Sequence, residues 1–126
     1  MNLNKVEVPG QKATIILTAF PGRTAQDDFS IEEMQRVLDY LETQNCHFFI
    51  SLVQDQEFEE FCSKSVFVEE LIRRPLKWLH FPILDMGVPD KCILSKLDSF
   101  RPNFVSCFEA GNSIAIHCKG GLGRSG

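Results

Sequence analysis

The chain has 126 residues, of which 44% are apolar, and a formal net charge of −4. This length fits one domain with a real core, and the negative charge argues against a nucleic-acid binder, since phosphate contacts need a basic face. The polar first residues do not resemble a signal peptide, and no apolar run approaches the roughly 18 residues of a membrane span.

The first part of the sequence predicts two strands with a helix between them. We expect the polar residues 1–12 to be a surface lead-in and residues 13–20 to form a buried strand that ends at a Pro-Gly pair. Residues 30–42 open with the Ser-x-x-Glu spacing of a capping box and carry an apolar stripe, which predicts a helix. Residues 46–53 predict a second buried strand. The strand–helix–strand order favours a parallel sheet.

The middle of the chain predicts further helices and a short strand. Residues 54–62 are acidic and hold one possible helical stretch, whereas residues 65–74 predict a better helix that ends before a proline. Residues 76–81 predict a short strand, after which a loop contains Asp85 and Asp90. His47 and His80 lie in strand patterns, so we expect them to be packed or surface residues.

The last predicted helix leads into the last predicted strand. Asp90 is well placed to cap a helix that continues to residue 111, with Pro102 either kinking it or starting a second helix. Residues 113–116 then predict a buried strand. The alternation predicts an α/β fold with a central, mostly parallel sheet of about four to five strands, flanked by helices.

Residues 117–126 have the sequence His-Cys-Lys-Gly-Gly-Leu-Gly-Arg-Ser-Gly, which predicts a loop that can bind an anion. Three glycines between Cys118 and Arg124 let the backbone curl until successive N–H groups point at one centre. Arg124 adds a planar fork of donors that can bind two phosphate oxygens at once. Such surroundings favour a thiolate, so Cys118 is a candidate nucleophile.

The pattern His-Cys-x5-Arg-Ser-Gly resembles the signature loop of the cysteine-dependent protein tyrosine phosphatase superfamily. Together with Phe-Pro-Ile-Leu-Asp at residues 81–85, it is most similar to the dual-specificity branch, and within it to the kinase-associated, cyclin-dependent-kinase-inhibitor-type phosphatases. The resemblance extends weakly from about residue 13 onward. It implies a phosphotyrosine phosphatase-like fold and a metal-independent enzyme without cofactors that hydrolyses phosphotyrosine and phosphoserine or phosphothreonine through a phosphocysteine on Cys118.

Roles for the other site residues follow from this chemistry and from the resemblance. The phosphate would be held by Arg124 and by backbone amides of Lys119, Gly120, Gly121, Leu122 and Gly123. The resemblance implies that Asp85 is the general acid. Asp90 is the alternative, but it could instead serve as a helix cap. The resemblance also implies that Ser125 donates to the sulfur of Cys118, although this hydroxyl could be an ordinary one at a helix start.

His117 and Lys119 flank the proposed nucleophile. The resemblance gives His117 a supporting role in the loop, and it is not expected to be a general base, because neighbouring strand residues point to opposite faces. Lys119 resembles other branches, including some that act on phosphoinositides, and could favour polyanionic substrates or only raise the local positive potential.

We expect one dual-specificity-type phosphatase domain over residues 1–126, incomplete after the signature loop. In the family this loop leads into a long helix, and these C-terminal helices are absent from the sequence, so we expect the isolated chain to be poorly soluble or weakly active. The odd number of cysteines, without a C-x-x-C pair, fits neither a disulfide framework nor a zinc site and indicates a reducing, cytoplasmic location. Three of them, Cys46, Cys92 and Cys107, are expected in the core.

Other functions remain open at this point. The loop could bind phosphate without hydrolysing it, as in a phosphoprotein reader or an inactive phosphatase fragment. A phosphoinositide phosphatase, a rhodanese or an arsenate reductase would also use a cysteine loop. The partner expected for the favoured function is a phosphorylated protein, such as a kinase.

Overall fold

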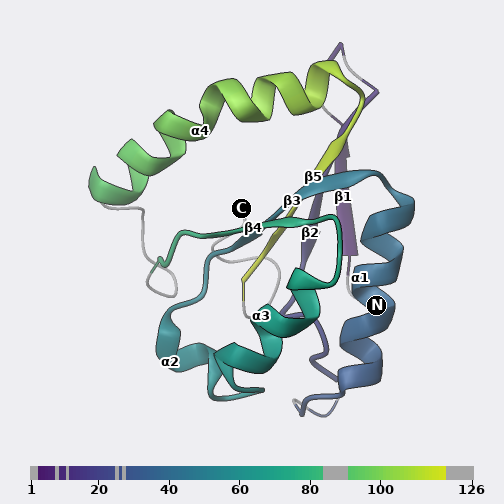
Figure 1. Ribbon diagram of the computed structural model, residues 1–126, viewed down its shortest axis with the longest axis vertical. Helices are drawn as coiled ribbons and strands as arrows, with labels where there is room; N and C mark the ends of the chain where they lie inside the picture. Colours follow the sequence, from purple (N-terminus) through teal and green to yellow (C-terminus); the bar gives the residue numbers. More distant parts are fainter. Residues whose placement is uncertain are drawn as a thin grey trace.

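The computed structural model describes residues 3–7, 9–10, 12–24, 26, 28–83 and 91–118. Within them, strands form one five-stranded sheet in the order β1-β2-β5-β3-β4. The pairings β2–β5, β5–β3 and β3–β4 are parallel, whereas β1 pairs antiparallel with β2. The predicted α/β fold with a mostly parallel sheet is therefore confirmed (Figure 1). The strand bounds are β1 Leu3–Glu7, β2 Thr14–Thr18, β3 Cys46–Ser51, β4 Lys77–His80 and β5 Ser113–His117.

Strand β1 contradicts the prediction that residues 1–12 are only a surface lead-in. Its residues pair in register with β2, from Leu3 opposite Thr18 to Glu7 opposite Thr14. The strand lies at the edge of the sheet, and the side chains of residues 4–7 are exposed, so hydrophobic alternation could not reveal it. Charged side chains such as Lys5 are typical of edge strands, because they oppose pairing with another chain.

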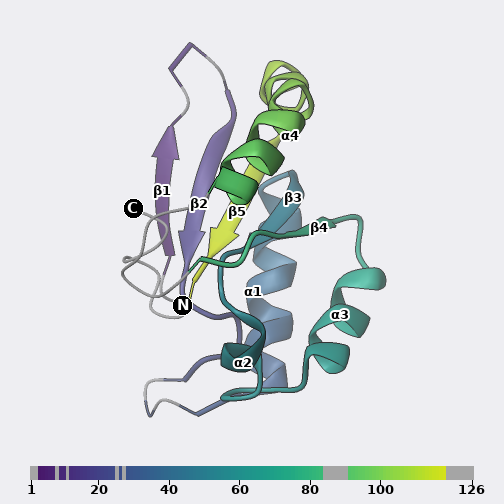
Figure 2. The ribbon, with the colours of Figure 1, turned by 90° about the vertical axis from the view of Figure 1, so that its left-hand side faces the viewer.

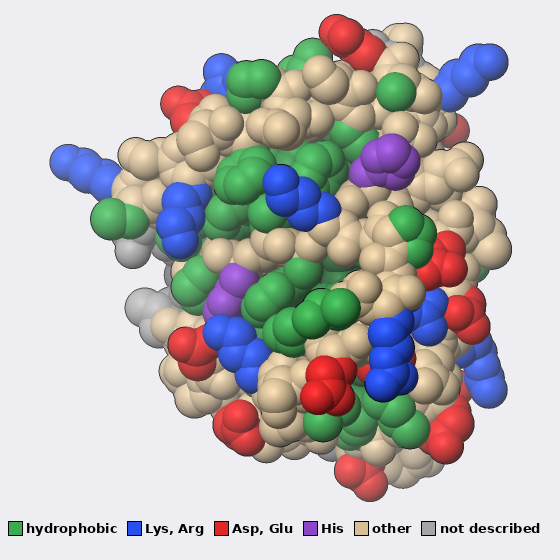
Figure 3. Space-filling view, in the orientation of Figure 1, with side chains coloured by type: hydrophobic (Ala, Val, Ile, Leu, Met, Phe, Trp, Pro, Cys, Tyr) green, Lys and Arg blue, Asp and Glu red, His purple; other side chains and the backbone are tan. Residues whose placement is uncertain are grey.

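Helices cover both faces of the sheet. Helix α4, Lys91–Glu109, lies on one face, and α1, Ile31–Thr43, lies on the other together with α3, Lys64–Ile72 (Figures 1 and 2). A single short turn of helix, α2 at Asp55–Phe58, precedes α3. Figure 3 shows apolar side chains at the surface between α4 and this lower group of helices. The layers are thus helix, sheet, helix, as parallel sheets require.

Each face of the sheet has its own hydrophobic core. The core on the α1 and α3 side contains Met34, Phe67 and Ala115, and the core on the α4 side contains Ile93, Cys107 and Ile114. Ile114 and Ala115 are neighbours in β5, so the alternation of a strand divides them between the two cores. Strand β5 is therefore buried on both sides, in the middle of the molecule.

The predicted helices largely follow their sequence signals. Ser30 caps α1 by accepting the backbone N–H of Glu33 at 3.3 Å, while the Glu33 carboxylate pairs with Arg36. Pro102 lies inside α4, so a second helix starting there is not formed. The prediction that Cys92 lies in the core is wrong, because this residue is exposed at the start of α4. Cys46 and Cys107 are buried, as predicted.

Candidate functional site

The candidate site lies at the carboxyl end of β5, where His117 ends the strand and Cys118 follows it. Carboxyl ends of parallel strands meet at one edge of a sheet, which is where open α/β folds place their ligands. The backbone N–H of Leu52 donates to the carbonyl of His117 at 3.0 Å, so the pairing of β3 with β5 continues to this edge. Cys118 is 1% exposed and packs in the core on the α4 side.

His117 and Cys118 face opposite sides of the sheet. The imidazole of His117 is completely buried on the α1 and α3 side, with ring centroids 5.3 Å from Phe20, 5.1 Å from Phe49 and 5.5 Å from Phe67. The expectation that His117 turns away from the cysteine side chain is confirmed. In this position the ring packs among aromatic side chains on the face of the sheet opposite the Cys118 side chain.

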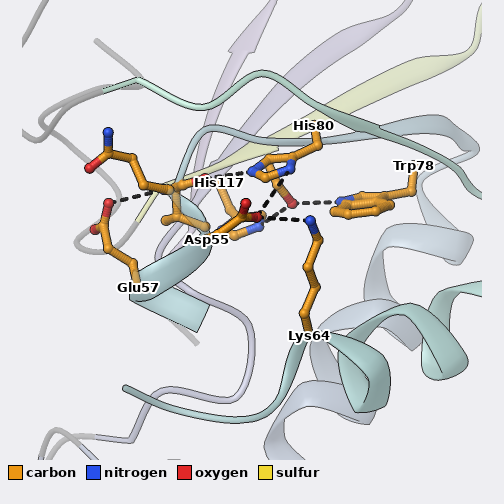
Figure 4. Close-up of polar contacts among 9 residues, drawn as sticks. Asp55, Glu57, Lys64, Trp78, His80 and His117 are labelled. Carbon is orange, nitrogen blue, oxygen red and sulfur yellow. Dashed lines mark hydrogen bonds and ion pairs between the residues drawn. The ribbon is translucent and has the colours of Figure 1, made fainter. Parts of the chain in front are cut away.

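A line of hydrogen bonds reaches His117 from the neighbouring strands. The indole Nε1–H of Trp78 on β4 donates to Ser51 Oγ on β3 at 2.7 Å, and Ser51 Oγ lies 2.6 Å from His117 Nε2 (Figure 4). The other ring nitrogen, Nδ1, lies 3.1 Å from the carbonyl oxygen of Cys118. Three adjacent strands thus contribute to one buried polar line that ends at the cysteine backbone.

A second polar group lies outside this line, around the ring of His80. His80 stacks on Trp78 with centroids 5.4 Å apart, and its Nε2 lies 2.7 Å from the carbonyl oxygen of Val53. Its Nδ1 is 4.0 Å from Asp55 Oδ1, which also accepts from Lys64 Nζ at 2.8 Å (Figure 4). Burial lowers the pKa of His80 below its ordinary value, while the hydrogen bond from Lys64 lowers the pKa of Asp55.

The segment after β4 approaches the same edge as Cys118. The backbone N–H of Phe81 donates to the carbonyl of Ser51, and that of Ile83 donates to the carbonyl of Leu52, both at 2.9 Å. Ile83 and Cys118 are members of the same core. The chain that precedes the predicted acid loop is therefore paired alongside β3 next to the cysteine.

Several predicted site residues lie outside the described residues: Asp85 and Asp90, and Lys119, Gly120, Gly121, Leu122, Gly123, Arg124 and Ser125. Of the predicted site, the structure describes His117 and Cys118, and it brings them to the middle of the sheet edge. Sequence reasoning missed Ser51 and Trp78. The one available signal was the single tryptophan of the chain, placed in a short strand, because a buried indole usually needs a hydrogen-bond acceptor.

The described residues contain neither a candidate metal site nor a candidate membrane-spanning helix. Among them, no three His, Cys, Asp or Glu side chains come together as metal ligands, and no helix has the length and hydrophobicity to cross a bilayer. The five cysteines, all of them within the described residues, form no disulfide. Burial raises the pKa of Cys46 to about 12 and that of Cys62 to about 11, so both are held as thiols.

Comparison with known proteins identifies the fold. No protein-family model matches the sequence, and a search of curated proteins gives no match. Among solved structures, a kinase associated phosphatase (KAP) with its catalytic-site cysteine replaced by serine matches 89% of this chain with a TM-score of 0.67 and 21% identity. PTPMT1 matches 85% with a TM-score of 0.54 and 22% identity. This chain has the phosphotyrosine phosphatase-like fold.

The similarity to these two structures establishes the fold of this chain. The chain spans 60% of the KAP chain and 58% of the PTPMT1 chain, and about four in five aligned residues differ in both comparisons. The five-stranded sheet flanked by helices agrees with the fold that the signature sequence implies. What this chain does with the fold depends on its own residues at the end of β5.

Proposed function

We propose that this chain belongs to a cysteine-dependent phosphoprotein phosphatase of the dual-specificity type. The observation that carries the proposal is the place of Cys118, directly after the central strand of a phosphatase-like fold and at the start of the sequence Cys-x5-Arg. Strand β5 pairs with a parallel strand on each side up to His117, and these pairings fix the position of the backbone that leads into Cys118.

The proposed reaction has two steps. The thiolate of Cys118 attacks phosphorus, the bond from phosphorus to the leaving oxygen breaks, and Asp85 donates a proton to that oxygen. The Asp85 carboxylate then takes a proton from water, the water oxygen bonds to phosphorus, and the S–P bond breaks to release phosphate and regenerate the thiolate. Backbone amides of residues 119–124 and the guanidinium of Arg124 stabilise the charge on the phosphoryl oxygens.

Two further residues have proposed roles in this scheme. The Ser125 hydroxyl donates a hydrogen bond to the sulfur of Cys118 and so eases the breakdown of the phosphocysteine. Lys119 raises the positive electrostatic potential at the entrance of the loop. The proposed substrates are proteins that carry phosphotyrosine, phosphoserine or phosphothreonine, with a kinase as one candidate partner. We also propose a reducing location such as the cytoplasm, because five cysteines without a C-x-x-C pair do not suit a disulfide framework.

The test of the nucleophile uses two cysteine variants. A chain extended past residue 126 is assayed on an aryl phosphate and on a panel of phosphopeptides and phosphoinositides. Cys118→Ser is compared with Cys92→Ser, which alters an exposed cysteine on α4. We expect hydrolysis to vanish only in Cys118→Ser, with phosphopeptide binding retained. Binding without hydrolysis by the wild type would favour a phosphate reader instead, and hydrolysis confined to phosphoinositides would contradict the proposed substrate class.

The test of the general acid compares the two aspartates of the loop after β4. On an ester with a poor leaving group, Asp85→Asn should slow turnover by about 10² or more, the usual effect of losing a general acid. Asp90→Asn should have a much smaller effect. The assignment of Asp85 is wrong if only the Asp90 substitution slows the reaction.

A further inference from the structure

The hydrogen bonds between Trp78, Ser51 and His117 have one consistent direction. An indole nitrogen can only donate, so Trp78 Nε1–H donates to Ser51 Oγ. At the other end a carbonyl can only accept, so His117 Nδ1 must carry a proton and donate to the oxygen of Cys118. The Ser51 hydroxyl lies between them and is free to donate its own proton to His117 Nε2 at 2.6 Å.

Other protonation states of His117 fit these contacts less well. With the proton on Nε2 alone, the bare Nδ1 would face the carbonyl oxygen of Cys118, and two acceptors would lie 3.1 Å apart. A ring protonated at both nitrogens would donate to Ser51 Oγ, and the Ser51 hydroxyl proton would then need a different acceptor. Ser51 and His117 are both completely buried, so a proton without an acceptor there would be costly.

We propose that Ser51 and Trp78 are positioning residues that hold His117 as the neutral, Nδ1-protonated tautomer and thereby fix the backbone carbonyl of Cys118. The inference rests on the proposed function in one respect, namely that Cys118 is the nucleophile. A peptide unit is planar, so a carbonyl held in place also fixes the direction of the N–H group that follows it. In the proposed mechanism that N–H group is the first amide of the phosphate-binding loop.

The surroundings keep this line of groups rigid. The indole of Trp78 is stacked against His80 on one side, and Lys64 Nζ lies 5.8 Å from the centroid of its ring. Edge-to-face contacts with Phe58 and Phe67, at 6.4 and 6.0 Å, hold the rest of the ring. The donor that starts the line therefore has little freedom to leave Ser51.

The experiment combines nitrogen-15 NMR of histidine-labelled protein with kinetics on an aryl phosphate. His47→Gln and His80→Gln variants identify the signals of His117, because the chain has 3 histidines. In the wild type we expect a protonated Nδ1 and a bare Nε2. In Ser51→Ala we expect mixed tautomers and a fall in kcat of about tenfold with KM little changed, the size expected for one lost hydrogen bond.

Two variants separate positioning from packing. Ser51→Thr keeps a hydroxyl and should restore both the tautomer and kcat. Trp78→Phe keeps a ring but removes the donor, so it should lower kcat in the same direction, and it carries the test if Ser51→Ala does not fold. The control Phe58→Leu disturbs packing against Trp78 without removing a hydrogen bond, and it should leave the tautomer unchanged.

The results separate this inference from the proposed function. A protonated Nε2 in the wild type, or normal hydrolysis with an unchanged tautomer in Ser51→Ala and Trp78→Phe, would overturn the positioning role alone. Suppose that a chain extended past residue 126 hydrolyses no phosphate ester, while its His117 tautomer still responds to Ser51→Ala. That result would remove the proposed function, but Ser51 would still be shown to set the tautomer of His117.

Discussion

Arg74, two residues after the end of α3, pairs with Asp39 on α1, on the side of the sheet that carries His117. Arg74 Nη1 donates to Asp39 Oδ1 at 2.7 Å and also lies 3.4 Å from Glu42 Oε1. The arginine side chain is only 13% exposed, whereas the carboxylates are 69% and 35% exposed. A mostly buried guanidinium therefore lies between two more exposed carboxylates. These ion pairs connect the end of α3 to α1.

Replacing Arg74 by methionine should destabilise the fold while keeping most of the apolar stem. We expect the free energy of unfolding to fall by about 1–2 kcal/mol. This value lies between the contribution of a buried hydrogen bond to a charged group, about 1.5–3 kcal/mol, and that of an exposed ion pair, about 1 kcal/mol or less. The matched control is Arg36→Met, which breaks an exposed ion pair within α1 and should cost about 0.5 kcal/mol or less. Equal effects in urea unfolding would contradict the linking role of Arg74.

Gly22 and Gly111 provide a second matched pair, because both have positive φ, +96° and +81°. A Cβ at Gly22 would lie 2.5 Å from a ring carbon of Phe29 and 2.9 Å from the carbonyl oxygen of Ser30, whereas one at Gly111 would meet nothing within 4 Å. Alanine at either site costs about 1–3 kcal/mol through its backbone conformation. Gly22→Ala should lose about 1–3 kcal/mol more through the clash. Equal melting temperatures for the two variants would show that the turn before α1 can relax.

The free thiols should differ in their rates of alkylation. Cys92 is exposed, whereas burial raises the pKa of Cys46 to about 12 and that of Cys62 to about 11. Thiolate is the reacting form, so at pH 8 iodoacetamide should label Cys92 well before either of the others. Peptide mass spectrometry after timed quenching measures the order. Early labelling of Cys46 in folded protein would mean that the core near β3 opens readily.

The sequence predicts the elements whose signals are local. Ser30 and Glu33 lie within four consecutive residues and mark the start of α1. The alternation of side chains along a strand places His117 and Cys118 on opposite faces of the sheet. The glycine-rich sequence after β5 lies outside the described residues, so the phosphate-binding loop stays a prediction. These features depend on residues close together in the chain, so no knowledge of the tertiary structure is needed.

The unpredicted features depend on distant residues or carry no pattern. Ser51 and His117 are 66 positions apart, and Trp78 and Ser51 are 27 apart, so only the parallel order of β4, β3 and β5 brings them together. A serine at the end of a mostly apolar strand gives no sign of its partner. Strand β1 was missed for a different reason, because an exposed edge strand needs no apolar alternation.

His80 should make the stability of the fold depend on pH. Burial lowers its pKa below the ordinary value of 6.5, against smaller opposing effects of the hydrogen bond to Val53 and of Asp55, while Lys64 and Lys96 lower it further. The unfolded chain therefore binds a proton at a higher pH than the folded chain. The stabilisation is complete above about pH 6.5 and is lost as the pH falls from there toward the folded pKa.

Urea unfolding between pH 5 and 8 measures this effect. His80→Gln can still donate to the carbonyl of Val53 but does not titrate, so it should flatten the decline seen in the wild type below pH 6.5. Asp55→Asn should steepen or extend the decline, because Asp55 raises the pKa of His80 and its loss widens the difference between the two states. The stabilisation due to Asp55 itself disappears only below its ordinary pKa of 3.8, outside this range. A decline that persists unchanged in His80→Gln would assign the pH dependence to another group.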